Sequence, residues 1–374
     1  MSNKNLSKPR LLFISRKWPP AIGGMETYSF ELYSGLLTEY NIKLLALPGK
    51  SNGKPPTLLS LGLFIAKVTL FCLLYGPKFD RVIFTDTLLF PAALAHSLVN
   101  RKAKRISVLH GLDLVYSNRK GFRSFIYGFV LKFIVGIRKI FFKIVTNSRS
   151  TQSIAISKGF DNTLIIVPSL PNQGFTSNLP KVFTKPDKYS ASKHPIFYFG
   201  RLIPRKGSLW FAKEVLPNLP DEVSFFVSGT INDPAYAEEL FSCPQVVYLG
   251  TIPGNEIVNY IRYSSLVVMP NIKIPESTDR EGFGLVAIEA SSVGCRLIAS
   301  DLEGLSDAVK DGVTGFQVSP NDPVKWINKI RELLSQSQKE KEEWVRSSAT
   351  ATREIYSQSL MVNKFSDLLE SESN

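Results

Sequence analysis

Cysteine and histidine are scarce in this chain of 374 residues, which has three of each. The cysteines, Cys72, Cys243 and Cys295, are scattered and form no CxxC pair. This pattern argues against a disulfide scaffold or a structural zinc site and indicates a reducing compartment. No histidine stands near a cysteine or a second histidine at metal-ligand spacing, so we expect no protein-held metal and no cofactor.

A long apolar run is also missing from the amino terminus, where MSNKNLSKPR leads directly into LLFIS. We therefore expect no secretory signal and a cytoplasmic protein. The most apolar later segment, 58–75, is interrupted by Lys67 and is marginal for a membrane span. We predict that it forms a buried crossover helix.

Acidic residues are few in the first half of the chain. Residues 1–180 hold 24 Lys and Arg against 7 Asp and Glu, a balance of +17, whereas residues 181–374 hold 21 against 25, a balance of −4. This asymmetry predicts an anionic partner for the first half: nucleic acid, an anionic membrane leaflet or a lipid phosphate.

The basic excess is concentrated in residues 101–143, which contain 11 basic residues and one acid, Asp113. Within this segment, Lys132 and Lys139 fall on one side of a predicted helix. Apolar residues at helical spacing fall on another side: Phe122, Ile126, Phe129, Phe133, Ile137 and Ile140. A packed helix with a solvated basic face is one interpretation, in which part of the apolar stripe is core. The wide apolar arc and the cationic remainder favour docking on an anionic membrane surface. Without a recognisable RNA- or DNA-binding motif, we predict no nucleic-acid partner.

What the sequence does contain is an alternation of strand-like and helix-like segments that suits two domains. The first strand, 10–16, is followed by Gly23-Gly24 and a helix from 25 to 39. This strand, turn and helix predict the opening of a Rossmann-like half, without the GxGxxG of a dinucleotide site. The paired glycines either let backbone N–H groups approach a phosphate or form a tight turn with no ligand.

The same alternation sets the expected domain boundaries. We predict an α/β protein with a Rossmann-like domain over 1–180, a second over 186–350 and a carboxy-terminal helix over 351–374 that packs back on the first. Residues 174–193, rich in Ser, Pro, Lys and Asn, are the expected linker. Near the end we expect a hairpin-like piece at 312–318 and one long helix over 342–369.

The most informative stretch is PESTDREGFGLVAIEASSVG, residues 275–294. Two carboxylates, Glu281 and Glu289, flank a Gly282-to-Leu285 turn that enters a helix. The unpaired N–H groups of a helix start bind phosphate well, and a carboxylate on each side accepts hydrogen bonds from hydroxyls. Phosphate flanked by hydroxyls describes a nucleotide sugar. The alternative is that both acids only favour the helix dipole.

Three further candidates follow predicted strands. Arg201 and Lys206 come after the strand 195–200, where two cations five residues apart can neutralise phosphate or belong to an ordinary basic loop. His110 ends a strand of the first half, where open α/β sheets bind ligands, although a lone histidine is often structural. Ile252, in the turn Gly250-Thr251-Ile252, could pack on a base.

These pieces form an ordered set: Gly23-Gly24, His110, FGRL-x-x-x-KG and EGFGL with its two acids. The set resembles the retaining glycosyltransferases of the GT-B fold, family 4 (glycosyl transferases group 1). The resemblance covers most of the chain. It implies two Rossmann-like domains facing across a cleft, an acceptor-binding first and a nucleotide-sugar-binding second, with a carboxy-terminal helix crossing back to the first.

The resemblance also implies a role for each residue. Arg201 and Lys206 would bind the donor diphosphate and stabilise its departure, Glu281 would hold sugar hydroxyls, and Glu289 would accept from the ribose. His110 would contact the sugar near the reacting carbon. The remaining implied donor contacts are Gly23, Gly24, Ile252, Gly282, Phe283, Gly284 and Leu285.

The implied activity is that of a retaining, metal-independent hexosyltransferase. We favour a UDP-sugar as donor over GDP-mannose, and expect a lipid-linked or glycan acceptor in cell-envelope polysaccharide or glycolipid synthesis, at the inner face of the cytoplasmic membrane. The stretch 272–280, with Glu276, Asp279 and Arg280, departs from the family's shorter version, so these residues either shape specificity or form only a loop. The alternatives are a nucleotide-sugar epimerase on the same fold and a non-catalytic, membrane-docked binder of nucleotide sugars.

Overall fold

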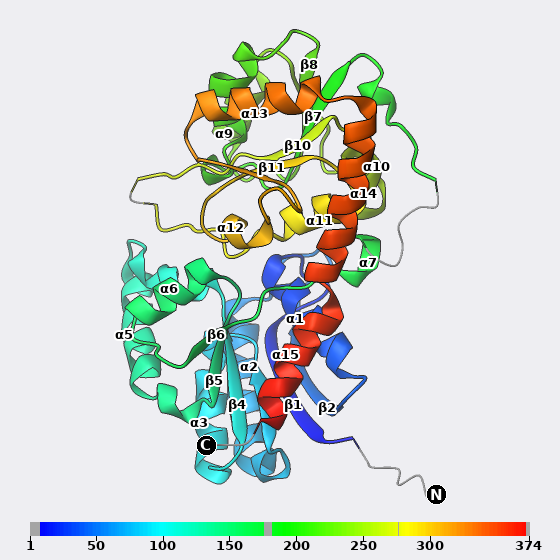
Figure 1. The fold of residues 1–374 in the computed structure, drawn as a ribbon. Coiled ribbons are helices and arrows are strands. Elements are labelled where there is room, and N and C mark those ends of the chain that lie inside the picture. Colours follow the sequence, from blue (N-terminus) through cyan, green and yellow to red (C-terminus); the bar gives the residue numbers. More distant parts are fainter. Residues whose placement is uncertain (1–7, 176–181, 276, 372–374) are drawn as a thin grey trace, which may run out of the picture. The chain divides into compact units, whose positions relative to one another are not determined.

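The computed structural model describes residues 8–175, 182–275 and 277–371. The chain forms two compact units, the first from residues 1–169 and 358–374 and the second from residues 170–357 (Figure 1). Each unit contains a six-stranded parallel sheet with helices packed on it. The predicted α/β architecture of two Rossmann-like halves is confirmed.

The sheet of the first unit has the strand order β2-β1-β3-β4-β5-β6. Its strands are β1 (Arg10–Trp18), β2 (Asn41–Pro48), β3 (Arg81–Phe84), β4 (Lys104–Leu109), β5 (Lys143–Thr146) and β6 (Thr163–Ile165). Its helices are α1 (Gly24–Leu36), α2 (Leu58–Tyr75), α3 (Phe90–Val99), α4 (Gly111–Val115), α5 (Phe122–Gly136), α6 (Arg149–Ser157) and α15 (Gln358–Glu370).

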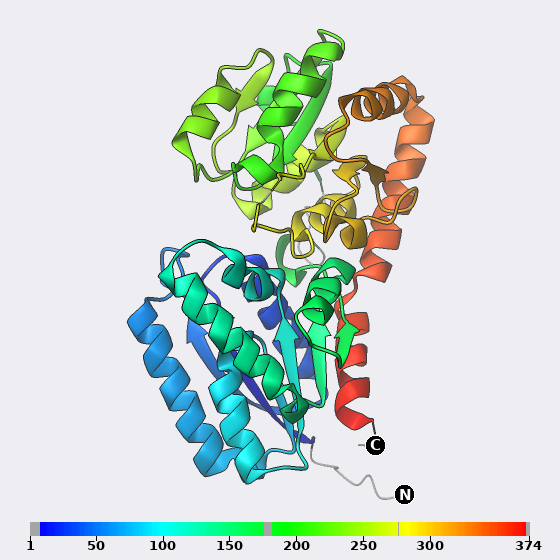
Figure 2. The same ribbon diagram turned by 90° about the vertical axis from the view of Figure 1, so that its left-hand side faces the viewer.

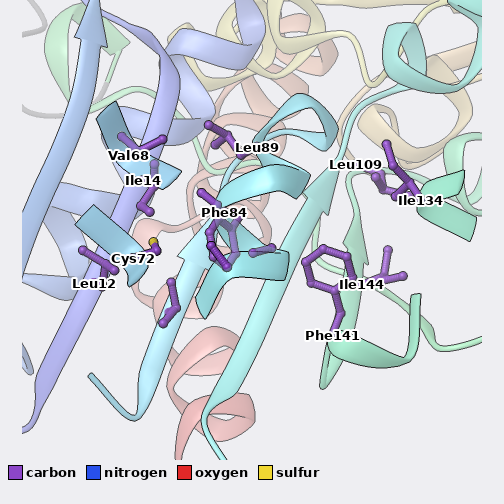
Figure 3. Close-up of a cluster of buried hydrophobic side chains, with 14 of the residues drawn as sticks. Leu12, Ile14, Val68, Cys72, Phe84, Leu89, Leu109, Ile134, Phe141 and Ile144 are labelled. Carbon is purple, nitrogen blue, oxygen red and sulfur yellow. The ribbon is translucent and has the colours of Figure 1, made fainter. Parts of the chain in front are cut away.

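Alternating residues of β1 divide the core of this unit into two layers. Leu12 and Ile14 face a layer that contains α2, α3 and α5, with Val68 of α2 and Ile134 of α5 among its buried residues (Figure 3). The neighbouring residues of β1 face α1 and α15 on the opposite side of the sheet. The sheet is therefore covered on both faces, as the alternation of elements predicts.

Helix α2 has the predicted bounds, but the prediction that it is buried is wrong. Only Phe64, Val68 and Cys72 are buried, one narrow stripe at intervals of four residues. Residues 58–78 have the length and apolar composition of a membrane-crossing helix, with a mean hydropathy of 2.1 and 11% of the window buried. The helix carries apolar residues on all of its sides, so its sequence has no periodicity that would show which side packs on the sheet.

Helix α5 is also turned differently from expectation. Its buried residues are Ser124, Leu131 and Ile134, whereas the predicted core stripe that begins at Phe122 lies mostly outward. The helix ends at Gly136, and a 3₁₀ turn over Arg138–Ile140 follows. Leu131 and Ile134 take the inner side because they reach the sheet beside β4 and β5.

The sheet of the second unit has the order β12-β11-β10-β7-β8-β9. Its strands are β7 (His194–Phe199), β8 (Val223–Ser228), β9 (Val246–Tyr248), β10 (Leu266–Met269), β11 (Leu297–Ser300) and β12 (Phe316–Val318). Its helices are α7 (Asn172–Phe175), α8 (Ser208–Trp210), α9 (Pro234–Phe241), α10 (Gly254–Tyr263), α11 (Leu285–Val293), α12 (Leu305–Ala308), α13 (Pro323–Ser335) and α14 (Gln338–Ile355).

The predicted hairpin-like piece at 312–318 is wrong. A turn closed by Gly312 N–H and Gly315 O leads into β12, which pairs in parallel with β11. Parallel pairing needs a long connection, and here the segment that includes α12 supplies it. The turn residues are typical of a hairpin, and they carry no information about β11, the distant strand with which β12 pairs.

The predicted long helix near the carboxyl end is two helices, α14 and α15, separated at Tyr356 and Ser357. Tyr356 is fully buried, and its hydroxyl donates to Asp307 O at 2.7 Å in the second unit. Beyond the break, α15 packs on α1, where Gln358 Nε2 donates to Glu31 O at 2.8 Å. The return of the chain to the first unit is therefore made by α15.

The units divide at 169/170 and 357/358, whereas the predicted boundaries stand at 180, 186 and 350. The earlier division has a local cause, because α7 packs beside α10 and α11 and Leu170 N–H donates to Tyr356 O at 2.8 Å. Residues 176–181 of the predicted linker lie outside the described residues.

Candidate functional site

The candidate site lies at the carboxyl edge of the second sheet, beside β7. This strand pairs with β8 on one side and β10 on the other, so the connections diverge there, which is where open α/β sheets bind ligands. The loops after β7 and β10 meet closely. A Cβ at Gly207, whose φ is 72°, would lie 1.8 Å from Pro270 O, so only glycine permits the approach.

Glu281 is the centre of this meeting point. Its Oε2 accepts from Arg205 Nη1 at 2.8 Å and Asn271 Nδ2 at 3.2 Å, and it also accepts from Lys206 Nζ. Burial alone would raise the pKa of the Glu281 carboxyl, but the neighbouring Lys206 and Arg205 cations outweigh it and hold the pKa well below its usual range. The carboxylate is therefore ionised near neutral pH and acts as a hydrogen-bond acceptor.

Arg205 was absent from the predicted site. Its side chain is buried between two carboxylates, with Nε 2.9 Å from Asp279 Oδ2 and Nη1 on Glu281. Burial would lower the pKa of the guanidinium, but both carboxylates together raise it above its ordinary value. Arg205 thus positions Glu281 and Asp279. Its place inside the FGRL-x-x-x-KG string was the only signal in the sequence.

Lys206 differs from Arg205 because Glu281 is its only carboxylate partner in the described part of the chain. Burial lowers the pKa of the Lys206 ammonium, and the attraction of Glu281 opposes this shift. The Lys206 ammonium lies at the switch point beside Glu281, where it can donate hydrogen bonds to Glu281 and to a bound anion at the same time. The phosphate role of Lys206 stays a prediction.

Glu303 is a second residue that the sequence did not reveal. Its carboxylate accepts from Glu281 N–H at 2.6 Å and from Arg280 Nη1 at 2.9 Å. It holds a φ of 54°, in the left-handed region that is strained for a residue with a side chain. The next residue is tightly packed as well, since a Cβ at Gly304 would lie 2.4 Å from Phe283 Cα.

The turn Gly282-to-Leu285 leads into α11 as predicted. Gly284 caps the helix with a φ of 96°, and a Cβ there would lie 2.6 Å from Leu305 Cδ2. Helix geometry leaves the N–H groups of Leu285 and Val286 without helical carbonyl partners. N–H groups at a helix start of this kind can bind an anion.

Glu289 is the fifth residue of α11. The residue keeps partial exposure, yet burial of its carboxyl raises the pKa to about 7. None of the ion pairs in the described part of the chain includes it, in contrast to Glu281. Its environment suits an acceptor whose hydrogen-bond donors come from a ligand.

Arg201 and Ile252 lie at the same edge of the sheet. Arg201 is exposed directly after β7, and its guanidinium forms no ion pair within the described ranges. Ile252 N–H donates to Ser228 Oγ at 3.3 Å, which ties the turn after β9 to the end of β8. Among the described residues, neither Arg201 nor Ile252 forms an ion pair or a side-chain hydrogen bond with Glu281.

Comparison with known proteins agrees with this geometry. Residues 193–336 match the family model of glycosyl transferases group 1. The matched residues lie within the second unit, which is therefore similar to the group 1 glycosyltransferases. A D-inositol 3-phosphate glycosyltransferase of Acidothermus cellulolyticus is 28% identical over 154 residues, which cover 37% of this chain and 33% of that protein. The chain thus matches about a third of that relative's length.

Solved structures extend the likeness to the whole fold. Anabaena Alr3699/HepE in complex with UDP has a TM-score of 0.71 at 19% identity, covering 97% of this chain and all of that one. A glycosyltransferase of Rickettsia africae has a TM-score of 0.70 at 17% identity, covering 98% of this chain and all of that one. The GT-B fold predicted from the sequence is confirmed.

The first unit contains a second cluster at its own switch point, between β1 and β3. Arg16 Nη2 lies 2.5 Å from Asp86 Oδ2 and 3.7 Å from Asp113 Oδ1. Burial and the nearby Asp86 raise the pKa of the Asp113 carboxyl to about 7, against the opposing effect of Arg16. The sequence did not reveal this cluster, because its members lie far apart in the chain, in β1, after β3 and in α4.

His110 borders the same cluster. It is buried, its Nε2 lies 3.2 Å from Thr85 O, and burial lowers the pKa of its imidazole to about 4. The ring is therefore neutral near pH 7, and because a carbonyl only accepts, Nε2 carries the hydrogen. The other ring nitrogen is then an acceptor, suited to a hydroxyl.

The remaining predicted residues of the first unit are Gly23 and Gly24. Gly24 is the first residue of α1, and Gly23 precedes it in extended conformation. A Cβ at Gly23 would lie 2.5 Å from Glu26 Oε2. The turn therefore leads into the amino terminus of a helix in the first unit.

Among residues 8–175, 182–275 and 277–371, no three His, Cys, Asp or Glu side chains are grouped as a metal site. Glu276 lies outside the described residues.

Proposed function

We propose that this protein transfers a sugar from a nucleotide-sugar donor that binds at the carboxyl edge of the second sheet. The observation that supports this is the ionised Glu281, held by Lys206 and Arg205 beside the amino terminus of α11. The arrangement offers a cation and helix N–H groups to a diphosphate, and a carboxylate to hydroxyls. A nucleotide sugar presents these groups together.

The proposed division of labour follows the contacts. Lys206 and Arg201 bind the diphosphate and stabilise the charge that develops as it leaves, which is commonly the largest catalytic contribution. Glu281 holds hydroxyls of the transferred sugar, and Arg205 keeps its carboxylate in place. Glu289, whose carboxyl is buried and forms no ion pair with the described residues, accepts from the ribose hydroxyls.

The remaining donor contacts are proposed from the family resemblance. The turn Gly282-Phe283-Gly284-Leu285 gives backbone N–H groups to sugar and phosphate, and Ile252 packs on the base. In the first unit, Gly23 and Gly24 contact phosphate and His110 contacts the sugar.

We further propose retention of configuration, in which the leaving phosphate oxygen deprotonates the acceptor on the same face, without a metal or an enzymic nucleophile. UDP is the favoured nucleotide, with support from the Anabaena structure that contains it, and GDP is the alternative. The acceptor is a lipid-linked or other glycan of the cell envelope, and residues 101–143 bring the protein to an anionic membrane.

Calorimetry with UDP, GDP and ADP tests the donor site. We expect selective binding of one nucleotide, weakened at least about tenfold by Lys206→Ala and by Glu289→Ala. Lys213→Ala is the matched control, since this exposed lysine of the same unit pairs with Glu239 away from the site. Binding of none of the three nucleotides would overturn the proposal. With an acceptor in hand, the anomeric coupling in the product tests retention.

A further inference from the structure

The outward side of α2 is a row of leucines. Leu59, Leu63, Leu70 and Leu74 are between 56% and 74% exposed. They lie four, seven and four residues apart, which puts them along one side of the helix. The helix contains no acid, and Lys67 is its only base. The three residues at its inner side, by contrast, belong to the core.

Helix α5 carries a matching row of phenylalanines. Phe122, Phe125, Phe129 and Phe133 are between 50% and 76% exposed. The rings of Phe125 and Phe129 contact one another edge to face, with centroids 4.9 Å apart. These four phenylalanines, each at least half exposed on a helix of 15 residues, form a large apolar surface that the described part of the protein leaves uncovered.

The two rows lie on one layer of the first unit. Helices α2, α3 and α5 cover the same face of the sheet and share one core. Helix α2 packs on α3. The ring of Phe90 in α3 contacts the ring of Phe133 in α5, with centroids 5.8 Å apart. Figure 2 shows the three helices, blue, cyan and teal, side by side in front of the sheet. We call the eight leucines and phenylalanines of the two rows the docking face.

Charge around the docking face selects its occupant. Residues 58–143 contain 14 Lys and Arg against 3 Asp and Glu, and Asp86 and Asp113 are buried. Lys132 lies over the ring of Phe129, 6.0 Å from its centroid. An apolar centre with a cationic surround matches the acyl chains and headgroups of an anionic bilayer. A second copy of the chain would instead bring like charges together.

We propose that the docking face inserts into the interface of an anionic bilayer, with α2 and α5 lying along the membrane. The leucines and phenylalanines enter to the depth typical of interfacial helices, about 5–10 Å. Helix α2 does not cross, because Phe64, Val68 and Cys72 hold it to the core. The proposal extends the membrane contact of residues 101–143 to a second helix and stands independently of the transfer reaction.

Vesicle flotation tests the role of α2. We compare the wild type with Leu59→Ser/Leu63→Ser/Leu70→Ser on mixed phosphatidylglycerol–phosphatidylcholine vesicles and on phosphatidylcholine alone. We expect binding to the anionic vesicles and at least about a tenfold lower partition coefficient for the variant, because three leucine side chains no longer enter the apolar layer. The control replaces three exposed valines of the second unit by serine: Val247, Val313 and Val324. Equal flotation of the α2 variant and the wild type would overturn the proposal.

Two measurements keep the test decisive if the triple variant folds poorly. Leu63→Trp reports insertion directly through quenching by brominated phosphatidylglycerol, relative to the wild type and to Val324→Trp. Quenching of Leu63→Trp alone is expected, and no quenching would contradict the proposal. A dimer in analytical ultracentrifugation that depends on α2, without vesicle binding, would assign the face to a second copy. Nucleotide calorimetry on the same variants reports the second unit, so failure of docking and failure of the donor site are separate results.

Discussion

Glu281 and Glu289 are two carboxylates eight residues apart with opposite environments. Cations hold the pKa of Glu281 well below its usual range, whereas burial raises the pKa of Glu289 to about 7. Glu281 is paired with Arg205 and Lys206, whereas no ion pair of the described residues includes Glu289. The proposed roles differ accordingly, since Glu281 is fixed as a carboxylate and Glu289 is open to hydrogen-bond donors from a ligand.

This difference predicts an unusual pH dependence for Glu289. If the ionised form accepts the ribose hydroxyls, nucleotide affinity is full above about pH 7 and falls by up to about tenfold per unit below it. Glu289→Gln should bind weakly with little pH dependence. Calorimetry between about pH 6 and pH 8 measures both, and a wild-type affinity that is flat over this range would contradict the assignment.

Glu289→Gln, which should weaken nucleotide binding, should increase the stability of the protein without nucleotide. Because the folded pKa of Glu289 lies above its unfolded value, the native state binds the extra proton, and stability falls as pH rises from about 4.5 to about 7. Glu289→Gln lacks this loss. Without nucleotide, it should therefore unfold at a higher temperature than the wild type near pH 8 and at the same temperature near pH 4.5, as followed by circular dichroism.

Glu303 offers a second test at the scale of one residue. Glu303→Ala removes the acceptor of Glu281 N–H but keeps the left-handed backbone, so we expect a loss of about 1–3 kcal/mol in unfolding free energy. Glu303→Gly loses the same carboxylate and relieves the backbone strain, so it should be more stable than the alanine variant by about 1 kcal/mol. Urea unfolding of both variants measures the difference, and equal stability would argue against strain.

Elements were predicted better than their surroundings. The bounds of α2 follow from an apolar run with turn residues on either side, but apolar residues on every side leave its orientation undetermined. Glu281, Lys206 and the start of α11 could be found because they lie in short local strings. Arg205 and Glu303 could not, because their partners are 76 and 22 residues away and meet only in the fold.

The entry to α11 depends on Gly284. Gly284→Ala adds a side chain at positive φ and against Leu305, so we expect a loss of about 1–3 kcal/mol in stability together with weaker nucleotide binding. Gly254→Ala is the control, because Gly254 begins α10 and has open space around it. That variant should be as stable as the wild type or slightly more so. Urea unfolding and calorimetry check both, and a fully stable Gly284→Ala would contradict the geometry.

At the scale of the whole molecule, the first unit is discontinuous. Its core includes Tyr28, Leu32 and Leu36 of α1 together with Val362 and Phe365 of α15. Truncation after Ser357 should therefore weaken the first unit, although the deleted residues follow the second. Limited proteolysis should cut the truncated protein within residues 1–169 first, and unchanged protection there would contradict the packing of α15.

A less drastic change probes the same contact. A Cβ at Gly35 would lie 2.3 Å from Val362 Cγ2, so Gly35→Ala should loosen α15. Adding Val362→Ala makes room and should restore part of the lost stability, which a double-mutant cycle measures. A double variant less stable than either single one would exclude this direct contact.

The position of α15 also fixes the order in which the two units can be completed. The second unit is one continuous stretch, residues 170–357, whereas the first also needs residues 358–374. Domains made from the amino terminus usually fold in that order during synthesis. Here the unit that begins first is finished after the second, and the side of α1 that packs on α15 stays uncovered until α15 has left the ribosome.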